Sequence, residues 1–443
     1  MISLLIAFII AVLFTILDGS GSAAVMLGLI LLICTLFCFS LPKRNRNSSL
    51  HLLTIVFSLY VSIAFIVSLS FNENQYFYVS DSMRYIADYM GRTSFQYDFH
   101  ELKDYYLNFY DSNLLFNAYL NEMALIMNKH FGGMTVYGMT LCLTLFGILS
   151  SIILYKIFLR HFDEKYAFRN VLIFSLCSPF FLYSTVIIRD IVICFLYLVA
   201  FDIIDRKFSV VRFILLIVVM LLTWGVRLYS GIFIGVFVWY YIYTSIRRTP
   251  YKTFGTVTSV LIGIVAIAAV LGSALFEQTT EELIGYEELS MERSEGGVVS
   301  RLMSLPPGIS NLCIVFFTMI RPLPPFSVFE GVTSFSNFTI SSLALLSGFF
   351  WFVSFYTFVL LAIFNHQLKK MSFEKILLLG ICLLFLLVNA AHPDVRRMLP
   401  VFPVLYLLFS YGLKDPVNAK AGTTYKKVLV TCYVVAAFAL LAV

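Results

Sequence analysis

The feature that most constrains this chain is a succession of apolar runs, each about as long as a helix needs to be to cross a bilayer. A spanning α-helix takes about 20 mainly apolar residues, and the run 2–17 is followed almost at once by a second run, 22–42. Only 13% of the 443 residues are charged, against about 25% in a soluble domain. The sequence therefore predicts an all-α integral membrane protein and excludes an ordinary soluble domain.

Thirteen runs meet this criterion or come close to it, and the interpretation is of about 13 transmembrane helices. The predicted spans are 2–17, 22–42, 50–70, 134–158, 171–188, 190–205, 209–225, 229–245, 254–276, 337–364, 374–391, 397–412 and 427–443. The run 309–320 is also apolar, but it is only about half the length of a span. Prolines flank it on both sides, which favours a re-entrant or interfacial segment.

The distribution of basic residues gives the orientation, because Lys and Arg accumulate in cytoplasmic loops. With the basic segment 43–46 placed inside, 20 of the 31 Lys and Arg residues fall in inside loops and 11 outside. The amino terminus is then cytoplasmic and the carboxyl terminus external. The net charge of +6 follows from this topology, so it does not indicate nucleic-acid binding.

Two outside loops are long, and they divide the sequence. The first contains two helical patterns, Asp81–Met90 and Leu114–His130, each followed by glycine, a common helix terminator. Their amphipathic spacing favours helices lying along the bilayer surface. The predicted parts are an amino-terminal three-helix segment 1–70, the first external loop 71–133, a central bundle 134–276, the second external loop with the re-entrant segment 277–336, and carboxyl-terminal transmembrane helices 337–443.

Cysteine usage and the amino terminus add little. The eight cysteines fall almost entirely inside apolar runs and show no Cys-x-x-Cys or Cys/His ligand spacing, so neither a disulfide framework nor a zinc site is expected. No removable signal peptide is expected either, because the first apolar run leads directly into a second one.

Arginines on the external side are the residues most out of place. Nine of the 11 outside basic residues are Arg, whose planar fork of donors matches phosphate and carboxylate oxygens. Such a set could bind a lipid-linked pyrophosphate. Each arginine could equally extend to lipid headgroups or pair locally, as Arg189 and Asp190 could with each other. The candidates at external span ends are Arg189, Asp190, Arg227, Tyr229, Arg321, Arg396 and Arg397.

Asp81 lies just beyond the third predicted span, with Arg84 and Tyr85 about one helical turn further on. A carboxylate at the water–lipid boundary can act as general base for a sugar hydroxyl. Aspartate is also a favoured helix N-cap, and the sequence does not decide between these roles. His392 is the external histidine best placed for a functional role, although a solvated loop histidine is the default interpretation.

Three short motifs carry a resemblance. The string 81–85, at the start of a large external loop, resembles the acid-containing motif of GT-C glycosyltransferases. The segment 392–403 is similar to a His-x-x-x-Arg…Pro pattern of lipid-phosphosugar mannosyltransferases in that group. Ser178-Pro179, Arg189-Asp190 and Arg227-Leu228-Tyr229 look like the layout of Wzy-type O-antigen and capsule polymerases. Unlike the GT-C acid, Asp81 follows the third span instead of the first. The sequence does not select a second carboxylate among Asp88, Asp98, Glu101, Asp104 and Asp111.

The resemblance implies a GT-C-like fold and a glycosyltransferase or polymerase in the bacterial inner membrane. It would use polyprenyl-(pyro)phosphate-linked sugars at the extracytoplasmic face in surface polysaccharide biosynthesis. The implied partners are the lipid-linked donor, a glycan acceptor, membrane lipids and polysaccharide-assembly proteins. No cofactor is required; a divalent metal is compatible with the chemistry but has no support in the residue pattern. The alternatives are a transporter or flippase of lipid-linked saccharides, and a structural or sensory membrane protein.

Overall fold

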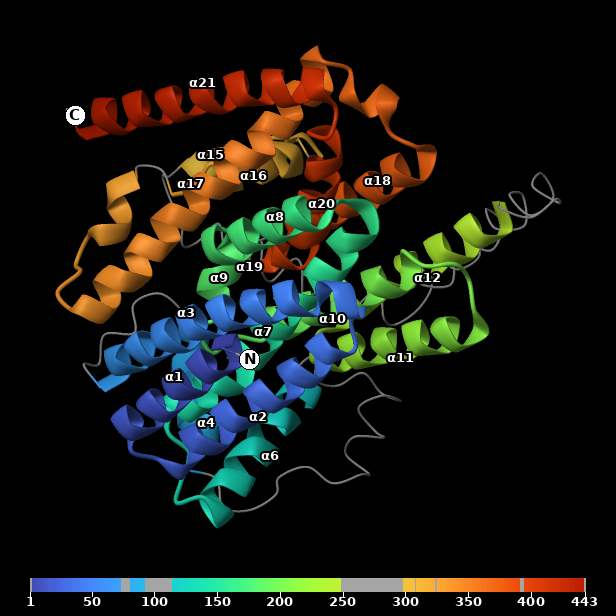
Figure 1. Cartoon of the computed structure of the whole chain (residues 1–443). Coiled ribbons are helices and arrows are strands. Elements are labelled where there is room, and N and C mark those ends of the chain that lie inside the picture. Colours follow the sequence, from blue (N-terminus) through green and yellow to red (C-terminus); the bar gives the residue numbers. More distant parts are fainter. Residues whose placement is uncertain are drawn as a thin grey trace. The chain divides into compact units, whose positions relative to one another are not determined.

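The computed structural model describes residues 2–72, 80–91, 114–247, 298–306, 308–322, 325–390 and 394–441, and within them it is helical, with no strand (Figure 1). The predicted fold class, an all-α protein, is confirmed at this level. The predicted span 254–276, parts of both predicted external loops and His392 lie outside the described residues.

The chain forms two compact units, each assembled from segments that are far apart in the sequence. The first unit comprises 1–195 and 322–351, and the second comprises 196–321 and 352–443. Two helices pass from one unit to the other, α10 (Asp190–Ile204) and α17 (Phe335–Phe364). The sequence-based division into five consecutive parts stays a prediction.

In the first unit, α1 (Ile2–Asp18), α2 (Gly21–Phe39), α3 (Arg46–Asn72) and α7 (Val136–His161) pack together (Figure 1). The short 3₁₀ helix η1 (Lys43–Asn45) joins α2 to α3. α7 has the most completely buried apolar surface of these helices and contacts both α2 and α3. η2 (Pro325–Phe329) also belongs to this unit.

Both helices predicted in the first external loop are present. α4 (Ser80–Tyr89) matches the predicted 81–90, and α6 has the predicted bounds, Leu114–His130. Gly132 and Gly133 end α6 with positive φ angles of 78° and 118°, and the amide of Gly133 donates to the Met127 carbonyl oxygen at 3.2 Å. This is a glycine-dependent helix termination.

The predicted span 171–188 is wrong as one continuous helix. The chain forms α8 (Glu164–Cys177), then the single turn α9 (Pro179–Tyr183), and then an irregular stretch, 184–189, before α10 begins. Pro179 explains the first break, because proline lacks the N–H that would continue the helix and clashes with the preceding turn.

In the second unit, α11 (Val210–Val226) and α12 (Leu228–Arg247) form a hairpin, and α12 packs on α18 (Phe373–Asn389). α18 also contacts α16 (Ile309–Thr318), α19 (Val395–Met398) and α20 (Phe402–Gly412). The remaining elements are α15 (Val298–Met303), η3 (Gln367–Lys370), η4 (Leu399–Val401) and α21 (Pro416–Leu441).

Prolines also divide the predicted span 397–412, which begins as α19 and η4 and becomes a regular helix, α20, only at Phe402. The apolar run 309–320 forms the ten-residue helix α16. At about 1.5 Å per residue, α16 is about 15 Å long, half of the hydrocarbon thickness. Its length therefore agrees with a segment that enters the membrane without crossing it.

Among the described residues, five helices are long and apolar enough to cross a membrane: α2, the segment Lys43–Ser70 including α3, α7, α12 and α17. α1, α11 and α16 are shorter apolar helices. Leu5, Ile9 and Leu13, one turn apart on α1, are 58%, 56% and 50% exposed. Such stripes suit contact with lipid, and the apolar helices indicate a multi-pass membrane protein. The number of 13 spans stays a prediction.

Candidate functional site

In the first unit, α4 is held against two other parts of the chain. Ser82 is fully buried and its Oγ donates to the carbonyl oxygen of Ile187 at 2.8 Å. The Tyr85 ring lies edge-on to Phe116 of α6, with 5.0 Å between ring centroids. The residues buried on α4 are Ser82, Tyr85, Ile86 and Tyr89, which share one face of a helix. Contacts with protein therefore account for the amphipathic pattern of α4.

The second partner of α4 is the irregular stretch 184–189. An irregular backbone at membrane depth needs protein partners for its polar groups. Thr144 Oγ1 of α7 donates to the Ser184 carbonyl oxygen at 3.0 Å, and Ser82 satisfies the Ile187 carbonyl in the same way. Gly147 permits this close approach, because a Cβ added there would lie 2.5 Å from Ser184 Cβ.

This stretch ends at Arg189 and Asp190, the predicted Arg-Asp pair. Asp190 is 2% exposed and is the first residue of α10, where the positive end of the helix dipole favours a carboxylate. Arg189 is half-buried, and its Nη1 is a buried donor with no hydrogen-bond partner in the part of the chain that the structure describes. A buried guanidinium nitrogen of this kind is suited to bind an anionic group.

The hydrogen bond from Ser82 brings the segment containing Asp81 next to the stretch that leads to Arg189. Two of the predicted motifs, more than 100 residues apart in the sequence, therefore meet in one unit. Asp81 lies in the first turn of α4, and its side chain is outside the described residues.

Arg84 and Tyr85, the other two candidates on α4, make contacts with protein. Arg84 Nε lies 3.7 Å from Asp88 Oδ2, and the two side chains are 75% and 45% exposed. Exposed pairs of this kind contribute little, about 0–1 kcal/mol. The Tyr85 ring belongs to the contact between α4 and α6.

A second cluster lies within the second unit, where α11 ends and α12 begins. Arg227 is 2% exposed, and its guanidinium carbon lies 5.4 Å from the centre of the Tyr229 ring. Tyr229 is equally buried, and its hydroxyl has no hydrogen-bond partner among the described residues. Tyr197 joins the cluster by donating to the Ser230 carbonyl oxygen at 2.9 Å. The cluster thus gathers hydroxyl and guanidinium donors in an apolar core.

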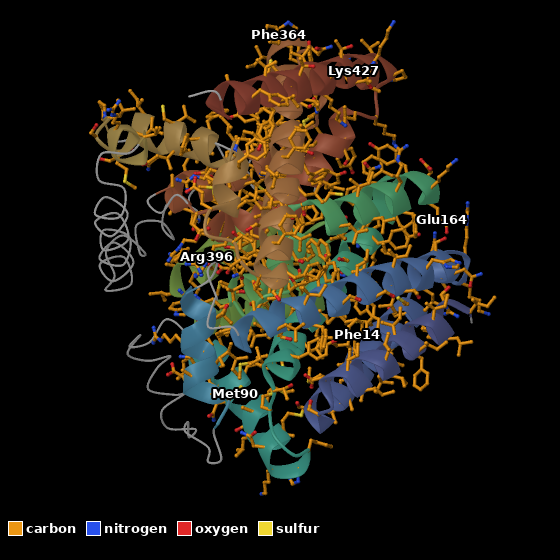
Figure 2. All side chains as sticks on the ribbon, turned by 90° about the vertical axis from the view of Figure 1, so that its left-hand side faces the viewer. Phe14, Met90, Glu164, Phe364, Arg396 and Lys427 are labelled. Atoms are coloured by element: carbon orange, nitrogen blue, oxygen red, sulfur yellow. The ribbon has the colours of Figure 1, made fainter. Side chains whose placement is uncertain are left out.

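The arginines of α19 have different surroundings, although α19 packs on the same helix, α18, as α12 does. Arg396 (labelled in Figure 2) lies 2.6 Å from Asp394 Oδ2 through its Nε, and its backbone amide donates to Asp394 Oδ1 at 3.0 Å. Asp394 is thus both N-cap and charge partner. Arg397 is 6% exposed. Arg321 follows α16, and its guanidinium carbon lies 5.2 Å from the centre of the Phe317 ring.

Sequence reasoning missed three buried polar side chains. Ser82 and Tyr197 give no signal, because their partners are backbone carbonyls that only the fold brings near. Asn121 on α6 is fully buried, and neither atom of its amide has a partner in the described segments. An amide on the apolar face of an amphipathic helix is a signal that could have identified it.

No group of three or more His, Cys, Asp or Glu side chains suited to holding a metal occurs within the described ranges. Comparison with known proteins adds no analogy. No protein-family model, curated protein or solved structure matches this chain.

Proposed function

We propose that this protein is a membrane-embedded glycosyltransferase or polymerase. It would act on polyprenyl-(pyro)phosphate-linked sugars at the extracytoplasmic face of the bacterial inner membrane, in surface polysaccharide biosynthesis. The observation that carries the proposal is the buried hydrogen bond between Ser82 and the Ile187 carbonyl oxygen. Through it, the helix with the candidate base Asp81 lies beside the irregular stretch that presents Arg189.

The residues at this position supply the two functions that glycosyl transfer needs. The acceptor hydroxyl oxygen would attack the anomeric carbon of the donor, and Asp81 would take the hydroxyl proton. The bond between that carbon and the phosphate oxygen breaks, and the polyprenyl (pyro)phosphate leaves with the electron pair. Arg189 would stabilise the negative charge that develops on the leaving phosphate. The atoms and charges balance without a further reactant.

The irregular stretch supports this proposal because it holds Arg189 in a fixed place. Pro179 breaks the preceding helix, and six residues run without regular structure between buried helices. Irregular backbone at membrane depth occurs where it is enclosed by protein or lines a polar cavity. Because donors in a buried site need no reorganisation as charge develops, a fixed guanidinium there is an effective electrostatic catalyst.

In the second unit, Arg227 and Tyr229 are proposed to bind the phosphate of a lipid-linked substrate. The buried Tyr229 hydroxyl has no hydrogen-bond partner among the described residues, so it would donate to a phosphate that enters from the lipid. The apolar surroundings suit a polyprenyl chain.

The test is a set of single substitutions in cells that make the surface glycan. Asp81→Asn and Arg189→Ala are expected to shorten or abolish the glycan, while lipid-linked precursor accumulates at the outer leaflet. Glu330→Gln is the matched control, because Glu330 is an exposed carboxylate of the same unit and is not among the candidate residues. Glycan length is measured by gel electrophoresis, precursor by labelling of the outer leaflet, and protein abundance by immunoblot.

Three results decide the matter. Unchanged glycan in both variants, with normal protein abundance, refutes the enzymatic proposal. Loss of glycan without precursor at the outer leaflet supports a flippase instead. An equal defect in Glu330→Gln contradicts the assignment of Asp81 as the base that acts at this site.

A further inference from the structure

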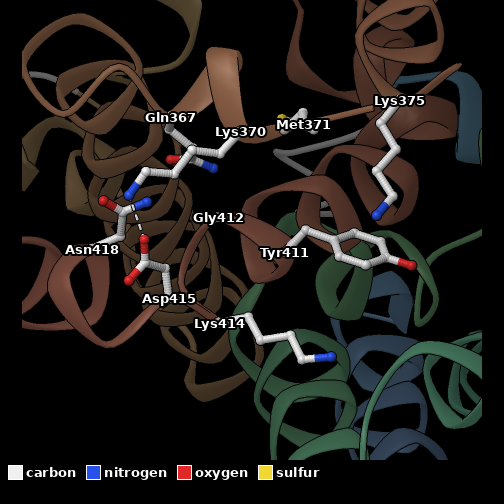
Figure 3. A pocket seen from close by; sticks show the side chains of 9 residues that line it. All are labelled: Gln367, Lys370, Met371, Lys375, Tyr411, Gly412, Lys414, Asp415 and Asn418. Atoms are coloured by element: carbon white, nitrogen blue, oxygen red, sulfur yellow. Dashed lines mark hydrogen bonds and ion pairs between the residues drawn. The ribbon is translucent and has the colours of Figure 1, made fainter. Parts of the chain in front are cut away.

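We propose that the second unit contains a separate binding site for a phosphate group, at the ends of helices where the charge distribution predicts cytoplasm. The site is a pocket of about 370 Å³, a size within the range of small-molecule sites. It is formed by the segments that follow α17 and α20, the end of α20, and the starts of α18 and α21 (Figure 3). The lining residues are Gln367, Lys370, Met371, Lys375, Tyr411, Gly412, Lys414, Asp415 and Asn418.

Three lysines and one aspartate line the pocket, so its charge is positive. Lys370 Nζ donates to Asp415 Oδ2. The same carboxylate accepts from the Val417 amide at 3.0 Å through Oδ1, and so also caps α21, whose first residue is Pro416. The one lining carboxylate is therefore engaged at both oxygens.

The other two lysines act on each other. Lys375 Nζ lies 3.4 Å from the centre of the Tyr411 ring, and Figure 3 shows its ammonium group over that ring. Lys414 also lines the pocket, and its positive charge repels that of Lys375. A bound anion would relieve this repulsion.

Two buried amide side chains indicate which hydrogen-bonding groups the bound anion has. Gln367 is 1% exposed, and neither its Nε2 nor its Oε1 has a hydrogen-bond partner among the described residues. The same holds for Oδ1 of Asn418, which is 2% exposed. Buried polar atoms without partners are rare in native structures and indicate an absent ligand or water. The Gln367 N–H donor suits a phosphate oxygen, and the amide oxygens suit a donor such as an O–H group on the same phosphate.

The shared chemistry is therefore a phosphate that carries a negative charge and an O–H group. Two sources fit it, hydrogen phosphate from solution and the headgroup of a phosphoglycerol lipid. Both would accept hydrogen bonds from Lys370, Lys414 and the Gln367 amide, and donate one to an amide oxygen. The pocket takes no part in the transfer reaction proposed above, so the two proposals stand independently.

The experiment uses the purified full-length protein in a neutral detergent. In the first arm, thermal stability is measured against inorganic phosphate, with chloride keeping the ionic strength constant. In the second arm, native mass spectrometry counts the phosphatidylglycerol molecules retained from nanodiscs of phosphatidylcholine with and without that lipid. A response to phosphate alone identifies the free anion as the ligand, and selective retention of phosphatidylglycerol alone identifies the lipid.

Matched variants test whether the ligand binds in this pocket. Lys370→Gln and Lys414→Gln are each expected to lower the apparent affinity for the phosphate ligand about tenfold, because each removes a charge-assisted hydrogen bond. Lys369→Gln makes the same charge change one residue away, at an exposed side chain that does not line the pocket, and is expected to have no effect. Gln367→Met keeps all charges and about the same side-chain length, and is expected to weaken the response severalfold.

Two outcomes would overturn the proposal. One is no saturable response of the wild-type protein to either phosphate or phosphatidylglycerol. The other is an equal loss in Lys369→Gln and Lys370→Gln, which would mean that general surface charge attracts the anion and the pocket does not bind it.

Discussion

The contact between Ser82 and Ile187 gives the sharpest test of the candidate site, because a single atom can be removed from it. Ser82→Ala deletes the hydroxyl that donates to the Ile187 carbonyl oxygen at 2.8 Å. Both residues are 0% exposed, so water does not replace the lost partner in the docked state. We expect α4 to undock more often as a result.

The magnitude follows from the burial of both groups. A neutral hydrogen bond contributes about 1 kcal/mol net, and a buried acceptor left without its donor costs roughly 1–3 kcal/mol. A loss of about 1–2 kcal/mol corresponds to a rise of about 5- to 30-fold in the undocked population of α4. α4 ends at Tyr89, and the following residue is held by Asn128, whose Nδ2 donates to the Met90 carbonyl oxygen at 3.0 Å.

Hydrogen–deuterium exchange of the peptide 80–91 measures this population, because local opening sets the exchange rate of its amides. The matched control is Ser70→Ala, which removes an equally buried hydroxyl that donates to Val67 within its own helix, at 2.6 Å. We expect faster exchange of 80–91 in Ser82→Ala alone, and shorter surface glycan in the same variant. Unchanged exchange, or an equal rise in Ser70→Ala, would refute the reasoning.

Three further predictions follow from single contacts. Gly147→Ala places a Cβ 2.5 Å from Ser184 Cβ and should destabilise the protein by about 1–3 kcal/mol, which a lower melting temperature would show. Gly28→Ala is the control, because a Cβ at Gly28 would have no atom within 4 Å, and it should leave the melting temperature unchanged. Arg227→Lys keeps the charge but loses the planar fork, so product formation should fall about ten- to hundredfold; normal activity would show that charge alone suffices. The hydrogen bond from Lys370 lowers the pKa of the Asp415 carboxyl in the folded protein. The ionised carboxylate therefore contributes its full stabilisation at pH values above the unfolded pKa of about 4. This stabilisation is lost as the pH falls through the lowered, folded-state pKa. Asp415→Asn keeps the cap on Val417 but removes the charge. The melting temperatures of wild type and this variant should therefore differ by a constant amount from pH 8 to pH 5 and converge below pH 4. A difference that changes between pH 8 and pH 5 would contradict this expectation.

Local signals predicted the helices of the first external loop well. The glycines after Met90 and His130 and the spacing of apolar residues were enough to place α4 and α6 within a residue or two. The broken segments were harder, since hydropathy averages over a window. Pro179, Pro400 and Pro403 lie inside apolar runs, and the irregular stretch 184–189 contains the apolar residues Val186, Ile187 and Ile188, so an averaged hydropathy does not reveal the break.

The candidate site was predictable only in part. Charge asymmetry and the choice of arginine over lysine drew attention to Arg189, Asp190 and Arg227 before any fold was known. Sequence could not separate them from Arg84, which proves to be an exposed partner of Asp88. Burial distinguishes them, and burial depends on which helices surround a residue.

The sequence by itself determined that this is a helical membrane protein, because length, hydropathy and helix termination are properties of neighbouring residues. Only the tertiary structure decided that Ser82 contacts Ile187, which is 105 residues away, and that Arg227 lies in an apolar core. These outcomes depend on how helices pack, and packing satisfies backbone groups, such as the carbonyls of the irregular stretch, with partners from anywhere in the chain.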